Sequence, residues 1–141
     1  MQLQHDSMEF FGARPKLPIE ACLEEVRKSD ILVIIIGHKY GSLVPDKGIS
    51  YTEVEYTEGY RLGKPCLVYF RDESVPVLPI FMERDLQKLP LLEKFCALLA
   101  SRHTVATFRD ARSLASRVTT DINRTIQDIG KLPPELVEQW T

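Results

Sequence analysis

The sequence predicts an α/β fold, a three-layer sandwich in which helices cover both faces of a mainly parallel β-sheet. Two observations lead to this prediction. Residues 31–36 and 66–70 are apolar without interruption, which is typical of strands buried on both faces of a parallel sheet. Segments with apolar residues at helical spacing alternate with these strands along the chain. We therefore expect the two strands to be adjacent, parallel, central and fully buried.

The first half of the chain supplies the elements around the first apolar strand. Residues 8–11 predict a short strand. The next helix can begin at Pro18 and end near Ser29, because proline lacks a backbone N–H and the first turn of a helix does not need one. A glycine-rich loop then covers residues 37–50. Ser50 is placed to cap the next helix, with Glu53 completing a capping box, and the helix should end at Gly63.

The second half repeats the alternation of strand and helix. After strand 66–70, residues 71–85 contain prolines and predict an exposed, irregular segment. A helix at 91–100, a strand at 104–108 and a final helix capped by Asp110 complete the order. We expect a single domain over residues 1–130, with residues 131–141 as a linker or tail.

Composition excludes several classes of protein. The 141 residues are 44% hydrophobic and 27% charged, with a formal net charge of -2. The sequence lacks the clustered basic face that would indicate a nucleic-acid partner. Its apolar runs are also far shorter than the ~20 residues of a membrane span. The cysteines Cys22, Cys66 and Cys96 lie among apolar residues without metal-like spacing, which predicts buried thiols in the cytoplasm, with no metal and no cofactor.

Several motifs together resemble a poorly characterised TIR-like domain. They are Pro18-x3-Cys22-Leu with Ser29-Asp30-Ile31, then Ile36-Gly-His-Lys-Tyr-Gly41, Gly48-Ile-Ser-Tyr-Thr-Glu-Val-Glu55 and Leu62-Gly-Lys-Pro65. The resemblance implies a TIR/flavodoxin-like fold at the amino end of a larger signalling protein, ahead of an NTPase module or helical repeats. Members usually open with a strand and a helix that precede the segment 8–11, and this chain lacks both. We therefore expect a half-built pocket, an exposed strand edge and a homo-oligomer.

A wider resemblance concerns chemistry. TIR domains that cleave NAD, and nucleoside deoxyribosyltransferases, carry a glutamate at the same interval before a Gly-Lys segment as Glu55 has before Lys64. The resemblance implies that Glu55 is the catalytic acid that attacks or stabilises the anomeric carbon of a sugar. On a helix, Glu55 shares a face with Tyr51 and Gly59, and a glycine there would leave room beside the carboxylate. The competing interpretation is a solvated surface glutamate.

Further candidate ligand-binding residues lie at the carboxyl edge of the predicted sheet, where open α/β folds bind ligands. They are Gly37, His38, Tyr40, Gly41, Ser50, Tyr51 and, on the segment 8–11, Glu9. Each has a structural alternative. The glycines suit a turn, Tyr40 suits the core, and Ser50 suits a helix cap.

The residues leave more than one function open. The leading hypothesis is a TIR-like signalling domain that binds a nucleotide such as NAD as substrate and cleaves its N-glycosidic bond. The first alternative is a non-catalytic module that self-associates and transmits signals for an attached NTPase. The second is a nucleoside deoxyribosyltransferase-like enzyme. The sequence does not decide whether the domain is an enzyme.

Overall fold

The fold follows the predicted alternation of strands and helices. The structure is a computed structural model that describes residues 18–130, so the segment 8–11 and the tail 131–141 lie outside the described residues. Its elements, in chain order, are α2 (Ile19–Lys28), β1 (Leu32–Ile36), α3 (Tyr51–Arg61), β2 (Cys66–Arg71), the short 3₁₀ helix η1 (Pro79–Phe81), α4 (Lys88–Arg102), β3 (Val105–Phe108) and α5 (Ala111–Gly130).

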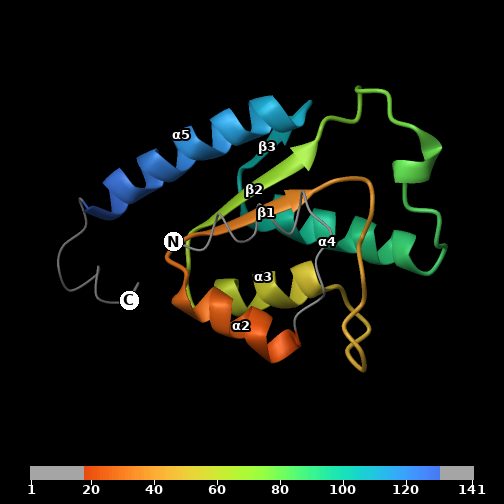
Figure 1. The fold of residues 1–141 in the computed structure, drawn as a ribbon, viewed down its shortest axis with the longest axis horizontal. Helices are drawn as coiled ribbons and strands as arrows, with labels where there is room; N and C mark the ends of the chain where they lie inside the picture. Colours follow the sequence, from red (N-terminus) through yellow and green to blue (C-terminus); the bar gives the residue numbers. More distant parts are fainter. Residues whose placement is uncertain (1–17, 131–141) are drawn as a thin grey trace.

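The three described strands form one parallel sheet in the order β1-β2-β3. Leu32 pairs with Cys66 and Ile36 with Phe70, while Val68 pairs with Val105. The prediction that the two apolar strands are parallel neighbours is therefore confirmed. All three strands point the same way, so the segments that follow β1 and β2 leave the sheet at one end (Figure 1).

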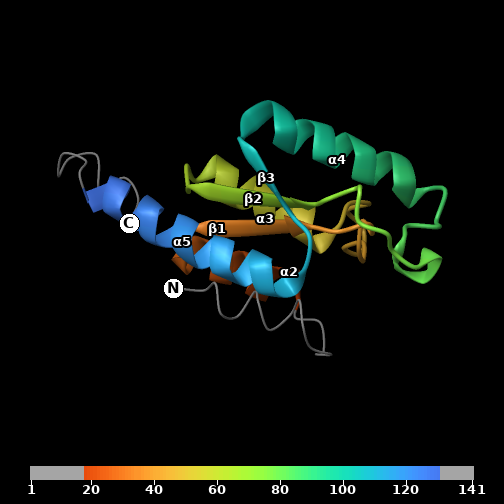
Figure 2. The same cartoon turned by 90° about the horizontal axis from the view of Figure 1, so that it is seen from above.

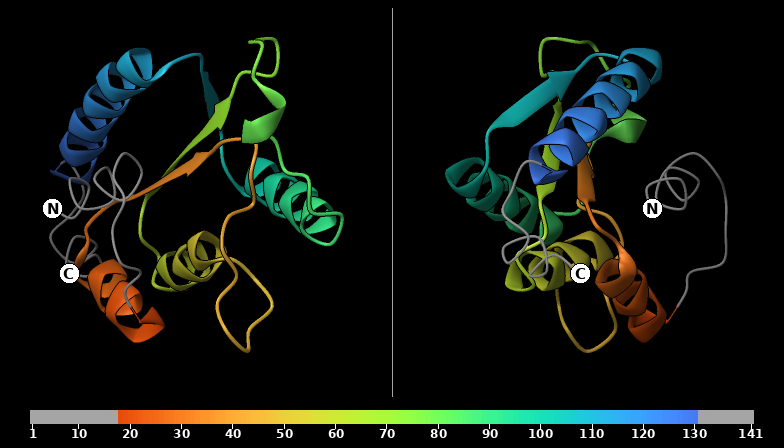
Figure 3. Two further views of the ribbon diagram at one scale, coloured as in Figure 1. Left: turned by 45° about the vertical axis from the view of Figure 1, so that its right-hand side comes forward. Right: turned by 90° about the vertical axis from the view of Figure 1, so that its left-hand side faces the viewer.

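Helices cover both faces of the sheet, which confirms the predicted α/β layering. Alternate residues of each strand point to opposite faces. On one face, β1 and β2 pack against α2, α3 and α4 through Val26, Tyr56, Phe95 and Leu99. On the other face, α5 contributes Leu114, Val118 and Ile122. Figure 2 shows α4 and α5 on opposite sides of the sheet, and Figure 3 shows α5 across the sheet from α3 and α4.

The second strand is less buried than predicted. Only Val68 and Tyr69 of β2 are fully buried, whereas Cys66 and Phe70 are half-buried. The expectation of two fully buried strands is wrong, because β2 is half-buried at both ends and Ile35 of β1 is half-buried as well. The carboxyl end of β2 opens into a cavity described below. Within the described sheet β2 is the middle strand, and β1 has a described neighbour on one side only. The sequence pattern showed that both faces of β2 are apolar, but it could not show how far the helices reach along them.

The helix boundaries show which local signals were correct. Ser50 accepts a hydrogen bond from the backbone N–H of Glu53 at 3.1 Å. Gly63 adopts a φ of 73° directly after the C-cap of α3. The Asp110 side chain accepts a hydrogen bond from the backbone N–H of Ser113 at 2.8 Å. Each predicted cap and stop signal is thus confirmed. Among residues 18–130, no helix combines the length and apolar character needed to cross a membrane.

Candidate functional site at the carboxyl edge of the sheet

The loop after β1 is fixed to the start of α3 by a buried tyrosine. Tyr40 is 4% exposed, and its hydroxyl donates a 2.6 Å hydrogen bond to Oε1 of Glu53. The same hydroxyl accepts a 3.1 Å hydrogen bond from the N–H of Ser50. The predicted capping box is therefore modified, because Tyr40 bridges the Glu53 carboxylate and the Ser50 N–H that would otherwise meet directly. Of the two interpretations of Tyr40, the structure shows core packing.

A second contact fastens the irregular segment after β2 to the same loop. The N–H of Glu83 donates to the carbonyl of His38 at 2.8 Å. In return, Oε1 of Glu83 accepts from the N–H of Tyr40 at 2.9 Å. These two bonds join segments that are far apart in the sequence. The carboxyl edge of the sheet is thus framed by two loops that hold each other in place.

The larger of two cavities at this edge lies over the ends of all three strands. It measures about 660 Å³, a size typical of small-molecule sites. Its lining comes from the end of β1, the end of β2, the segment 72–83, one face of α4 and β3. The lining residues are Ile36, Gly37, His38, Phe70, Arg71, Asp72, Glu73, Met82, Glu83, Leu89, Leu92, Glu93, Cys96 and Thr107.

Two buried nitrogen atoms in this lining have no hydrogen-bond partner. They are Nε2 of His38 and Nε of Arg71. Within residues 18–130 they are the buried side-chain polar atoms left unpaired. A buried polar group without a partner costs on the order of 1–3 kcal/mol, so such atoms in a native structure need an explanation. Both residues line one cavity, which makes this cavity the candidate ligand site of the edge.

Glu55 lies in α3, outside the linings of these cavities. Its neighbours on the helix surface, three and four residues later, are Glu58 and Gly59. Glu58 bonds Nε of Arg27 on α2 at 2.9 Å, and Gly59 packs against Leu32 of β1. Half-buried Glu55 is therefore on the face of α3 that is turned toward α2 and β1. The linings of the two cavities do not include it.

The room expected beside Glu55 is already filled. A Cβ atom on Gly59 would lie 2.6 Å from Cδ2 of Leu32 and 3.6 Å from Cγ1 of Val26. The small residue at this position thus serves close packing of α3 on β1 and α2. The interpretation that Gly59 leaves space for a ligand is wrong, because core side chains occupy that space.

The structure brings some of the predicted site residues together and separates others. Gly37 and His38 line the larger cavity, and Gly41 lines the smaller one. Tyr40 and the 1% exposed Ser50 are engaged in the cap of α3, where Tyr51 donates its N–H to the carbonyl of Ser42 at 3.1 Å. Glu9 lies outside the described residues. The binding roles of these residues stay predictions.

Sequence reasoning missed Arg71 and Glu83. Arg71 ends β2, and a charged residue directly after an apolar strand is a recognisable signal for the carboxyl edge. Glu83 gave no comparable signal, because it lies in an irregular segment whose course depends on its contacts with the loop 37–50.

The cysteines pack in or beside the core. Cys22 is buried, while Cys66 and Cys96 are half-buried, and none of the three forms a disulfide bond. Burial raises the pKa of Cys66 to about 11, and it also raises the pKa of Cys96, with Glu73 adding to the effect. Both thiols are thus protonated near neutral pH. Among the described residues, no group of three or more His, Cys, Asp and Glu side chains could hold a metal ion.

In residues 18–130, these features define an α/β domain with helices on both faces of a parallel sheet and cavities at its carboxyl edge. The family model described as "Domain of unknown function (DUF4062)" matches residues 1–123, and the chain belongs to this family. No curated protein and no solved structure matches the chain.

Proposed function

We propose that the domain binds a nucleotide such as NAD at the carboxyl edge of its sheet. The observation that carries this proposal is the larger cavity, whose lining includes two residues with an unpartnered buried nitrogen. A nucleobase has ring and carbonyl acceptors for Arg71 and His38, and its exocyclic amines suit a carboxylate such as Glu93. Phe70 and Leu92 offer apolar contact to its ring. The resemblance to NAD-cleaving TIR domains supports the same class of ligand.

The binding test is calorimetric titration of the whole chain with NAD. Arg71→Met removes the buried donor and keeps the length of the side chain. We expect it to weaken binding by about tenfold or more, which corresponds to the loss of one charge-assisted hydrogen bond. Arg112→Met is the matched control, because Arg112 is exposed on α5 and lines neither cavity. Equal affinity of both variants and wild type, or no binding by any of them, contradicts the proposal.

Cleavage of the N-glycosidic bond is the catalytic part of the proposal, and Glu55 is its proposed acid. A carboxylate can stabilise the oxocarbenium-like transition state or form a covalent adduct with the sugar. Because Glu55 lines neither cavity, cleavage is tested separately from binding. In the intact protein, Glu55→Gln should lower NAD consumption by about 10²-fold or more, the range typical of a lost acid or base. Glu24→Gln, an exposed change of the same charge on α2, should leave the rate unaltered.

Two outcomes of that assay lead elsewhere. Base exchange between deoxynucleosides, in place of NAD loss, would indicate the deoxyribosyltransferase-like reaction. Turnover that is absent, or that does not respond to Glu55→Gln, would remove the catalytic part and leave a binding module.

A specific observation favours the self-association module as the second candidate. Four apolar residues in and beside η1 are largely exposed: Leu78 is 66%, Ile80 63%, Phe81 57% and Met82 46% exposed. Contiguous apolar patches of this kind mark interaction sites. If this segment mediates a homo-oligomer, Phe81→Ser should convert the oligomer to monomers in light scattering. Tyr60→Ser, which changes an exposed aromatic residue near the carboxyl end of α3, should not. A monomeric wild type at tens of micromolar would end this candidate.

A further inference from the structure

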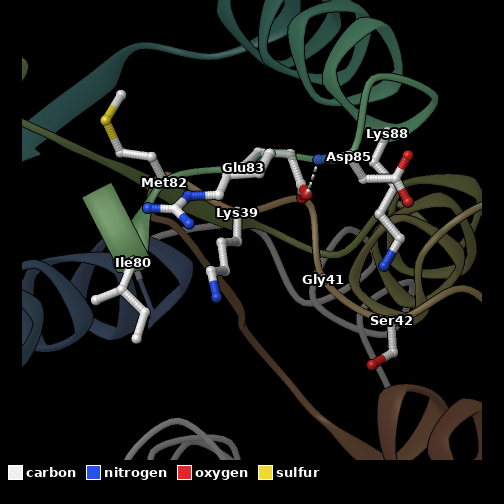
Figure 4. A pocket seen from close by; sticks show the side chains of 9 residues that line it. Lys39, Gly41, Ser42, Ile80, Met82, Glu83, Asp85 and Lys88 are labelled. Carbon is white, nitrogen blue, oxygen red and sulfur yellow. Dashed lines mark hydrogen bonds between the residues drawn. The ribbon is translucent and has the colours of Figure 1, made fainter. Parts of the chain in front are cut away.

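Three basic side chains converge on the smaller cavity from three separate segments. Lys39 follows β1, Arg84 lies in the segment after β2, and Lys88 is the first residue of α4. The cavity measures about 460 Å³ and is also lined by Gly41, Ser42, Ile80, Met82, Glu83 and Asp85. In Figure 4, the side chains of Lys39 and Lys88 extend on either side of Gly41.

The two carboxylates in this lining are already used by backbone groups. Glu83 accepts from the N–H groups of Tyr40 at 2.9 Å and Asp85 at 3.3 Å. Asp85 accepts from the N–H of Gln87 at 2.8 Å. None of the basic side chains that line the cavity takes part in a salt bridge within residues 18–130. The lining of the cavity therefore carries more positive than negative side chains, and its positive groups have no counter-ion among residues 18–130.

Lys88 carries a positive charge at the N-terminus of α4, where positive charge is unfavourable. The N-terminus of a helix carries partial positive charge, so acidic residues are favoured there and basic ones are not. The first turn of α4 has no acidic residue, and Gln87 at the N-cap makes no side-chain capping bond. Positive potential from the helix adds to that of the basic side chains, and the carboxylate of Asp85, which accepts the N–H of Gln87, offsets part of it. An anion at this place would offset both.

The turn facing these cations presents further donors. Gly41 has a φ of 95°, a backbone conformation that favours glycine, and there is open space where a Cβ would be. In the part of the chain that the structure describes, the backbone N–H groups of Gly41 and Ser42 donate no hydrogen bond. Backbone N–H groups and cations together are the usual partners of phosphate.

The smaller cavity adjoins the larger one, because the two share lining residues. Met82 and Glu83 line both. We propose that the smaller cavity is a phosphate site, and that the ligand of this edge is a nucleoside diphosphate group whose base enters the larger cavity. This inference rests on the proposed nucleotide binding and specifies which cavity takes which part of the ligand. Lys39, Arg84 and Lys88 bind the phosphates, and His38 and Arg71 bind the base.

The test compares ADP, the diphosphate half of NAD, with adenosine in calorimetric titrations of the whole chain. We expect ADP to bind about tenfold or more tightly than adenosine, and only the ADP affinity to fall with added salt. Lys88→Met should remove this advantage, while Lys94→Met, the same change on an exposed residue of α4 outside both linings, should keep it. Lys88→Met should unfold at the wild-type midpoint or above it, because it removes an unfavourable charge at the helix start.

The outcomes separate the two proposals. ADP and adenosine binding with equal affinity, unchanged by Lys88→Met, would overturn the phosphate site and keep the base site. Failure of both ligands to bind would overturn nucleotide binding and the phosphate site with it. Equal losses in Lys88→Met and Lys94→Met would show a general charge effect and would also overturn the phosphate site.

Discussion

Replacing Tyr40 by phenylalanine tests the cluster that holds the carboxyl-edge loop on α3. The change deletes the hydroxyl that donates to Glu53 at 2.6 Å and accepts from the N–H of Ser50 at 3.1 Å. A hydrogen bond to a charged group contributes about 1.5–3 kcal/mol, and a buried unpaired donor costs about 1–3 kcal/mol. Ser50 is only 1% exposed, so water cannot readily replace the lost partner, whereas the half-buried Glu53 can recover part of its hydration. We expect a loss of about 2–3 kcal/mol in the free energy of unfolding.

The assay is urea unfolding followed by circular dichroism, with Tyr60→Phe as the control. Tyr60 is 44% exposed, and its ring contacts with Tyr56 and Arg102 do not need the hydroxyl. The control should stay within about 0.5 kcal/mol of wild type. A value for Tyr40→Phe inside the same limit would refute the argument that this hydroxyl closes the cap of α3.

The pH dependence of the same variant gives an independent check. Burial, followed by the hydrogen bond to Glu53, raises the pKa of Tyr40 above its usual value. A tyrosine with a raised pKa stabilises the fold fully below its unfolded-state pKa of about 10, and this contribution is lost as pH rises through the folded-state pKa. The stability difference between wild type and Tyr40→Phe should therefore shrink above about pH 10. A difference that stays constant to the alkaline limit of folding would argue against it.

Three other changes have definite expectations. Gly59→Ala should destabilise by about 1–2 kcal/mol, because overpacking against Leu32 outweighs the helix propensity gained, and the added change Leu32→Val should recover part of the loss in urea unfolding. The pKa of His103, which bonds Tyr56, is lowered by burial and by Arg102, so its contribution is full above about pH 6.5 and falls below it. His103→Gln should therefore flatten the decline of thermal stability between pH 7.5 and 5.5, and an unchanged slope would contradict this. Asp110→Ala should cost about 1 kcal/mol through loss of the N-cap of α5, and a neutral result would contradict the cap.

Local signals in the sequence were enough for most of the fold. The unbroken apolar runs predicted parallel neighbouring strands, and the caps Ser50 and Asp110 lie where the sequence placed them. These features depend on residues that are close in the sequence, so they can be read from it. The burial of β2 could not, because it depends on how far α4 and α5 extend along the strand.

The candidate site was only partly predictable for the same reason. Gly37, His38 and Gly41 follow an apolar strand and therefore lie at the carboxyl edge, as expected. The segment after β2 shapes both cavities, yet its course depends on a contact between Glu83 and Tyr40. No local pattern announces that contact. Gly59 was misread because a glycine beside a candidate acid fits both a binding site and a tight helix crossing.

The polar residues at this edge are of two kinds, those with hydrogen-bond or ion-pair partners in the described chain and those without. Tyr40, Ser50, Glu53 and Glu83 satisfy one another or nearby backbone groups, so their hydrogen bonds contribute to folding.

The nitrogen atoms of His38 and Arg71, and the charges of Lys39 and Lys88, lack such partners in the described chain. Groups of the first kind stabilise the fold in the absence of a ligand, whereas in the proposed nucleotide complex groups of the second kind gain their partners from the ligand. Substitutions of the first kind should therefore change the free energy of unfolding. Substitutions of the second kind should change affinity while leaving the fold intact. The contrast between Tyr40→Phe and Lys88→Met puts this division to the test within one loop and the helix beside it.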